Sequence, residues 1–134
     1  MRSAPMTKHA KLSDANYAIM KIIWEREEAS VNDIHEAIQQ ARGDTVKRES
    51  IQVQVKRLAK YGWLNRRKEG KTFFYSAISG QEDANRDILN DVKDRVFGGS
   101  QSELVKCLFE STRITKGELA RIRSMLKDYE TNSE

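Results

Sequence analysis

The first apolar residues of the chain recur every three or four positions, which is the spacing of one face of a helix. Ser13 can cap a first helix that ends near Glu27, and Ser30 can cap a second one that ends at Gly43. Asp33 follows Ser30 by three residues, as in a capping box. The apolar positions are Ala15, Ile19, Ile22, Ile23 and Trp24, then Ile34, Ala37, Ile38 and Ala41. The pattern predicts two short helices.

The helical period continues from Ser50 to Gly62 and separates an apolar face from a basic one. At ~100° per residue, the apolar side chains Ile51, Val55 and Leu58 fall within about 60° of one another. The opposite side and its flanks carry Glu49, Gln52, Val53, Lys56, Arg57 and Lys60. We therefore expect a third helix that packs one face on the core and leaves the other free.

After Gly62 the pattern changes to the aromatic and β-favouring residues of strands, from Trp63 to Ala77. The run is interrupted at Lys68-Glu-Gly-Lys71, which predicts a hairpin with its tip at these residues. Three helices followed by a hairpin is the order of a winged helix-turn-helix domain. The predicted fold is therefore mainly α with a small β-hairpin wing.

Three further helices are expected at about residues 80–97, 101–111 and 116–130. Each begins with a capping-box pattern, at Ser79 to Glu82, Ser100 to Glu103 and Thr115 to Glu118. Their apolar stripes need a partner, because three helices of this size bury little surface alone. A second copy of the chain is the simplest partner, and folding back on the N-terminal domain is the alternative. The expected dimer contacts are Val96, Leu104, Leu108, Leu119, Ile122, Leu126 and Tyr129.

Positive charge is concentrated between Arg42 and Lys71. This segment has ten Lys or Arg and three Asp or Glu, a net +7 compared with +4 for the whole chain. Residues 1–80 carry a net +6 and residues 81–134 a net −2. A basic helix followed by a basic hairpin suits a groove of double-stranded DNA and its phosphates. We expect a flexible tail at 1–11, a winged-helix DNA-binding domain at 12–79 and a helical dimerisation domain at 80–130.

Candidate DNA contacts lie on the third helix and the hairpin. Gln52 can pair with adenine in the major groove, Val53 can pack on a thymine methyl group, and Ser50 can contact a phosphate or a base. A merely solvated helix face is the alternative for each. The expected phosphate contacts are Lys47, Arg48, Lys56 and Lys60 on or near the helix, with Lys68 and Lys71 at the wing. Arg57 can contact DNA or pair with an acidic residue of another helix.

Several classes of protein are disfavoured. No nucleophile elbow, phosphate-binding loop or catalytic His–carboxylate pattern is present, so we expect no enzyme and no cofactor. One cysteine and two histidines do not suggest a metal site. No run approaches the roughly 20 apolar residues of a membrane span, and the first eleven residues lack the apolar core of a secretory signal. A cytoplasmic location without membrane contact is expected.

The order of these segments resembles the penicillinase repressor family, which includes methicillin-resistance and β-lactamase repressors and copper-responsive relatives. The segments that carry the resemblance are Leu12 to Trp24, Ser50-Ile51 with Lys56-Arg-Leu58, Trp63 to Arg67, Phe73 to Tyr75, and Phe97-Gly-Gly99 followed by Leu104-Val105. The resemblance implies a homodimeric transcriptional repressor that binds an inverted repeat. Its recognition helix would span about 49–62 and its wing about 66–72. A winged-helix protein-interaction module without sequence-specific DNA binding is the alternative.

The chain departs from the family at three places. Ser50-Ile-Gln-Val-Gln54 replaces the usual Thr-Ile-Arg-Thr-Leu-like run of the recognition helix, so base preference is not carried over. Cys107-Leu108 stands where proteolytically released repressors have Asn-Phe, and the tail from Tyr129 to Glu134 has no cysteine for copper. The operator, the regulated genes and the cause of release, whether an unknown signal or a protease, are left open.

Overall fold

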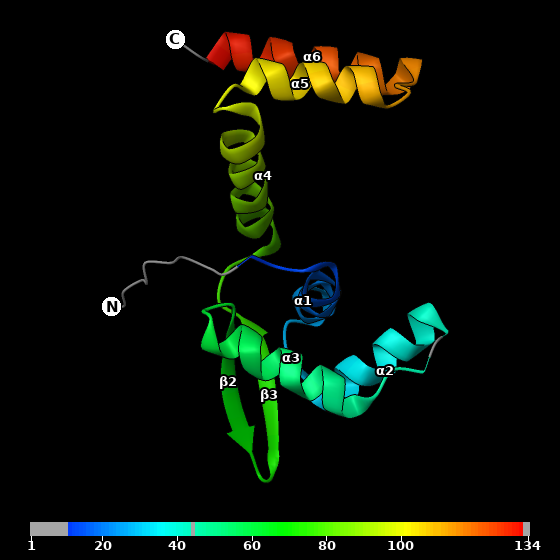
Figure 1. The fold of residues 1–134 in the computed structure, drawn as a ribbon, viewed down its shortest axis with the longest axis vertical. Coiled ribbons are helices and arrows are strands. Elements are labelled where there is room, and N and C mark those ends of the chain that lie inside the picture. Colours follow the sequence, from blue (N-terminus) through cyan, green and yellow to red (C-terminus); the bar gives the residue numbers. More distant parts are fainter. Residues whose placement is uncertain (1–10, 44, 133–134) are drawn as a thin grey trace. The chain divides into compact units, whose positions relative to one another are not determined.

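The structure is a computed structural model that describes residues 11–43 and 45–132. The elements are α1 (Asp14–Arg26), β1 (Ala29–Ser30), α2 (Val31–Arg42), α3 (Arg48–Lys60), β2 (Leu64–Glu69), β3 (Thr72–Ala77), α4 (Gln81–Phe97), α5 (Gln101–Ser111) and α6 (Lys116–Asn132) (Figure 1). This order confirms the predicted, mainly helical winged fold. Apart from Lys11, the tail predicted at 1–11 lies outside the described residues.

The first two helices begin at the serines that the sequence indicates. The Ser13 hydroxyl accepts a hydrogen bond of 3.1 Å from the backbone N–H of Asn16. At α2, Ser30 and Asp33 form a reciprocal capping box with bonds of 3.1 and 3.0 Å. These bonds satisfy backbone donors that a helix leaves unpaired at its first turn. Gly43 ends α2 in the left-handed conformation, at a φ of 72°.

α3 begins at Arg48, two residues before the expected Ser50, because Lys47 takes the extended N-cap position. Its buried residues are the three apolar positions that the period predicted, Ile51, Val55 and Leu58. The imidazole of His35 on α2 is hydrogen-bonded to the backbone carbonyl of Val46. This bond ties the segment before α3 to α2, so the start of α3 is fixed by a contact that spacing alone does not reveal.

The hairpin of β2 and β3 is the predicted wing, and the structure adds a strand to it. β2 and β3 pair antiparallel, with Glu69 opposite Thr72, so Gly70 and Lys71 form a two-residue turn. Gly70 has a φ of 64°, a conformation that glycine adopts without strain. β1 pairs with β3 in a sheet of order β1-β3-β2. A strand of two residues is too short to produce a detectable period in the sequence.

The described chain divides into two compact units between Ile88 and Leu89, within α4: a first unit that reaches from residue 11 to 88 and a second from 89 to 132. The start of α4 packs in the first unit, where Ala84 is completely buried. The Tyr17 hydroxyl donates a 2.8 Å hydrogen bond to Asn85 and accepts one of 3.1 Å from Gln81. α4 therefore contributes its first two turns to the N-terminal core. The functional division expected at residue 79 stays a prediction.

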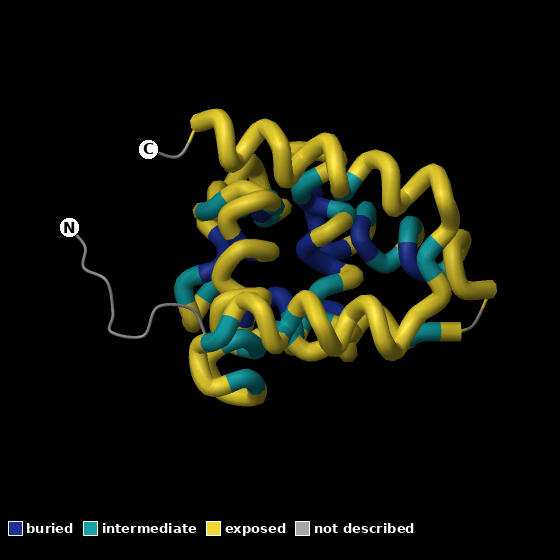
Figure 2. The backbone as a smooth tube through the Cα atoms, turned by 90° about the horizontal axis from the view of Figure 1, so that it is seen from above, coloured by how far each residue is buried: buried dark blue, intermediate teal, exposed yellow. Residues whose placement is uncertain are grey.

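The second unit has helices but no interior. Ser100 and Thr115 accept 3.1 Å bonds from the N–H groups of Glu103 and Glu118, as two of the three capping patterns predicted. At the third pattern, α4 begins after Gly80 and not after Ser79. α5 and α6 run in opposite directions and lie apart, and no residue of either helix is buried (Figures 1 and 2). The buried core of the described chain ends at Ala84.

Candidate nucleic-acid interface

The free face of α3 carries the residues that could read bases. Val53 is 57% exposed, and Ser50 is exposed as well, whereas Gln52 is half-buried. Gln54, on the same helix, accepts a 2.9 Å hydrogen bond from the side chain of Asn16 in α1. Both glutamines are half-buried, but they differ in their contacts: Gln54 is hydrogen-bonded to α1, and Gln52 lies beside the wing.

A hollow of about 350 Å³ lies where α3 faces the sheet. Its walls come from β1 and the start of α2, the first three turns of α3, and both strands and the turn of the wing. The lining residues are Ser30, Val31, Asn32, Arg48, Gln52, Lys56, Arg66, Lys71, Thr72, Phe73 and Tyr75. Four of these are cations and none is a carboxylate. We call this feature the basic hollow, and its positive charge favours an anionic partner.

The structure brings some of the predicted DNA contacts together and leaves others apart. Arg48, Gln52, Lys56 and Lys71 line the basic hollow. The remaining predicted contacts lie outside it; they are Lys47 at the N-cap of α3, Ser50, Val53, Arg57 and Lys60 on α3, and Lys68 on β2. All six are exposed. Their side chains are therefore accessible, but they do not line the hollow.

Three of these cations have neighbours that define their positions. The Arg48 guanidinium donates a hydrogen bond to the side-chain oxygen of Asn32 at the start of α2. The Lys60 ammonium lies 5.7 Å from the centre of the Tyr61 ring, and the Lys68 ammonium lies 5.6 Å from that of Phe73. Arg57 makes no ion pair with another described residue. The structure therefore gives no support to the alternative that Arg57 pairs with an acidic residue of another helix.

Two adjacent arginines of β2 point to opposite faces of the sheet. Arg66 shares its face with Leu64 and lines the basic hollow, where its guanidinium carbon lies 4.3 Å from the centre of the Phe73 ring. Arg67 points to the other face and contacts Phe74 at 5.0 Å. Arg66 was not among the predicted DNA contacts. The alternation from buried Leu64 was the signal in the sequence that could have identified it.

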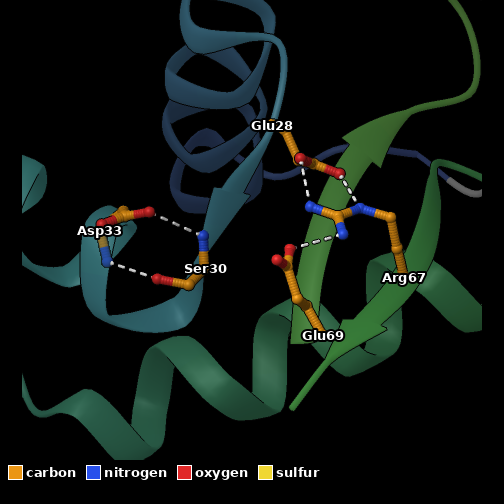
Figure 3. Close-up of polar contacts among 5 residues, drawn as sticks. All are labelled: Glu28, Ser30, Asp33, Arg67 and Glu69. Atoms are coloured by element: carbon orange, nitrogen blue, oxygen red, sulfur yellow. Dashed lines mark hydrogen bonds and ion pairs between the residues drawn. The ribbon is translucent and has the colours of Figure 1, made fainter. Parts of the chain in front are cut away.

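Arg67 is held by two carboxylates (Figure 3). Its Nε and one terminal nitrogen donate to the two oxygens of Glu28, at 2.9 and 2.8 Å, and the other terminal nitrogen donates to Glu69 at 2.8 Å. The hydrogen bonds and charge of Arg67 lower the pKa of Glu28 below its ordinary value. The two carboxylates in turn raise the pKa of Arg67. This cluster joins the segment before β1 to β2, across β3.

Other kinds of site find no support in the described residues. In residues 11–43 and 45–132, no group of three or more His, Cys, Asp or Glu side chains could hold a metal ion. Within the same ranges, no helix has the length and apolar character needed to cross a bilayer. Cys107 lies exposed on α5. The basic hollow and its surroundings therefore remain the candidate site.

A sequence comparison agrees with this geometry. The model of the penicillinase repressor family matches residues 12–128. The chain belongs to this family. The methicillin resistance regulatory protein MecI of Mammaliicoccus sciuri is 29% identical over 119 residues, which cover 89% of this chain and 95% of MecI. The penicillinase repressor of Bacillus licheniformis is 24% identical and covers 96% of this chain and 99% of its own length.

A solved structure supports the same assignment for the N-terminal part. The solution structure of the DNA-binding domain of the repressor BlaI matches with a TM-score of 0.50 and 30% identity. It covers 57% of this chain and 90% of the BlaI domain. The predicted winged-helix fold and family are thereby confirmed. Because the family consists of repressors, the expectation that the chain is not an enzyme is confirmed as well.

Proposed function

We propose that the chain is a homodimeric transcriptional repressor that binds an inverted-repeat operator in double-stranded DNA. α3 enters the major groove, where Gln52 reads bases, and the wing grips the phosphates beside it. The observation that carries this proposal is the gathering of Arg48, Lys56 and Lys71 around Gln52 with no carboxylate in the hollow. The membership in a family of repressors and the likeness to the DNA-binding domain of BlaI support it.

The exposed apolar side chains of the second unit support the homodimer. Leu108 on α5 is 51% exposed, and Leu126 and Tyr129 on α6 are 58% and 73% exposed. Of the other predicted contacts, Val96 and Leu119 are exposed, while Leu104 and Ile122 are half-buried. A single chain leaves these side chains in water, at a cost of roughly 25 cal/mol per Å² of apolar surface. In a dimer with a two-fold axis, each copy would cover the exposed apolar side chains of the other copy's helices.

Selection of bound duplexes from a random library with the full-length protein tests this function. We expect two enriched half-sites in inverted orientation, because each protomer presents one α3. Gln52→Ala should weaken binding to the selected site by about 1–3 kcal/mol and relax the preference at one base position. Gln54→Ala is the matched control and should keep the preference, since Gln54 bonds to Asn16. Absence of any enriched sequence would favour the protein-interaction module.

A further inference from the structure

Arg66 and Arg67 carry the same charge, but only Arg66 is free to bind an anion. Two carboxylates satisfy the guanidinium of Arg67. Among the described residues, no carboxylate forms an ion pair with Arg66. Its guanidinium lies instead over the Phe73 ring, at 4.3 Å from the centre. Stacking on an aromatic face fixes the plane of a guanidinium and leaves its N–H groups available at the rim.

The surroundings of Arg66 favour a phosphate as its partner. The basic hollow places Arg66 with Arg48, Lys56 and Lys71, which come from the start of α3, its third turn and the wing turn. Four cations with no carboxylate repel one another when the hollow is empty, and an anion between them relieves this repulsion. Arginine binds phosphate oxygens with two parallel N–H groups, which adds geometry to charge.

We propose that Arg66 binds one backbone phosphate of the duplex in the basic hollow, with Phe73 holding the guanidinium in place. This inference rests on the proposed function, because it assumes that α3 and the wing meet DNA. Arg66 is then an anchor that contributes affinity without base preference. It sets how deeply α3 sits in the groove, because the hollow lies between that helix and the wing.

Salt-dependent binding of full-length Arg66→Ala tests the inference. The variant should lose roughly the same factor in affinity, about tenfold, on the selected operator and on random duplex. Its plot of log affinity against log salt should be flatter by about one unit, as expected for one lost phosphate contact. Arg66→Lys should keep the slope but recover only part of the affinity, since an ammonium group lacks the paired donors. Lys21→Ala removes an exposed charge on α1 and should leave the slope unchanged.

A duplex with single phosphates replaced by neutral methylphosphonates locates the contact. At one position per half-site, the replacement should weaken the wild-type protein and have no further effect on Arg66→Ala. Phe73→Leu should show a smaller loss at the same position, because it removes the ring but not the cation. Independent losses from the protein and DNA changes at every position would overturn the inference.

Inorganic phosphate distinguishes a free anion from a DNA phosphate. The side-chain Nε–H resonance of Arg66 should shift with duplex but not with millimolar inorganic phosphate. Only a duplex is also held by the other contacts of α3 and the wing, and these contacts keep its phosphate in the hollow. A shift with inorganic phosphate, together with an unchanged DNA slope in Arg66→Ala, would assign the hollow to a free phosphate group and overturn the inference. If wild type binds all duplexes equally, the repressor proposal fails and the phosphate contact is still measured on random DNA. If wild type binds no duplex, both fail.

Discussion

Arg66 and Arg67 are neighbours in the sequence and identical in chemistry, and their surroundings give them different roles. The pleat of β2 sends Arg66 toward α3 and Arg67 toward Glu28. The charge of Arg67 is therefore paired with Glu28 and Glu69, whereas the charge of Arg66 has no carboxylate partner among the described residues. A count of basic residues treats both as equal contributors to DNA binding. The fold shows that only Arg66 faces α3.

The Glu28–Arg67 pair predicts a pH dependence of stability. The folded state lowers the pKa of Glu28, so the unfolded chain binds the proton more readily. The stabilisation is fully present above the unfolded pKa of about 4.3 and is lost as pH falls toward the lower folded value. Glu28→Gln should therefore be less stable than wild type at pH 7, and the difference should shrink below pH ~4. Urea unfolding of both proteins across this range measures the effect.

Both side chains of this pair are partly exposed, at 37% for Glu28 and 50% for Arg67, so solvent limits the size of the effect. Glu25→Gln is a suitable control because Glu25 is exposed on α1 and forms no ion pair with the described residues. Its stability relative to wild type should not follow the same pH course. An equal difference for Glu28→Gln at pH 3 and pH 7 would contradict a role for the charged pair.

At the scale of elements, α4 belongs to the N-terminal core at its start and to the second unit at its end. The capping pattern at Ser79 predicted the helix but not its packing. Trp24 donates a 2.9 Å hydrogen bond to the backbone carbonyl of Ser79, and Ala84 is fully buried beyond it. A chain cut at the apparent linker would therefore lose part of its own core.

Two truncated chains, one ending at Ile88 and one ending at Ser79, test whether the first turns of α4 belong to the N-terminal domain. A chain ending at Ile88 should unfold cooperatively, and one ending at Ser79 should be less stable by about 2 kcal/mol. The shorter chain loses the burial of Ala84 and the hydrogen bonds of Gln81 and Asn85 to Tyr17, each worth about 1 kcal/mol. Chemical denaturation of both chains measures the difference. Equal stabilities would mean that the first turns of α4 add nothing to the domain.

At the scale of the whole molecule, the contrast is between a first unit with an interior and a second unit without one. Every buried residue in the described chain lies between Ile19 and Ala84. Leu108 on α5 and Leu119 and Leu126 on α6 are exposed. Figure 2 colours nearly all of both helices as exposed. A stable dimer interface of about 1,200–2,000 Å² would cover them. The oligomeric state is therefore the property on which the proposed repressor depends.

Charge in the apolar stripe should separate the protomers. Leu126→Glu should raise the dimer dissociation constant by at least about thirtyfold, since a buried interface leucine is replaced by an unpaired carboxylate. Ser124→Glu is the control, because Ser124 lies on the opposite side of α6 from Leu119, Ile122 and Leu126. Sedimentation at micromolar concentration measures both variants. A wild-type protein that sediments as a monomer, or a Leu126→Glu variant that stays dimeric, would contradict the proposed interface.

The sequence by itself determined the helices and the hairpin with their amphipathic faces, though not β1. The caps at Ser13, Ser30, Ser100 and Thr115 act within one turn, and the buried positions Ile51, Val55 and Leu58 follow from the period of a helix. Both are local properties, which depend on residues three or four positions apart. The family resemblance followed from the order of these local segments, and the comparisons confirmed it.

Only the tertiary structure decided which side chains meet. β1 exists because Ala29 lies opposite Tyr75, and the start of α4 contacts α1 through the hydrogen bond between Tyr17 and Asn85. The basic hollow collects cations from α3, β2 and the wing turn, and the Glu28–Arg67 pair spans 39 residues. Such pairings depend on how distant segments close on one another, and no spacing along the chain encodes them. The sequence therefore predicted a basic helix and wing. Only the structure showed that Arg66 lines the basic hollow and that Arg67 is paired with Glu28.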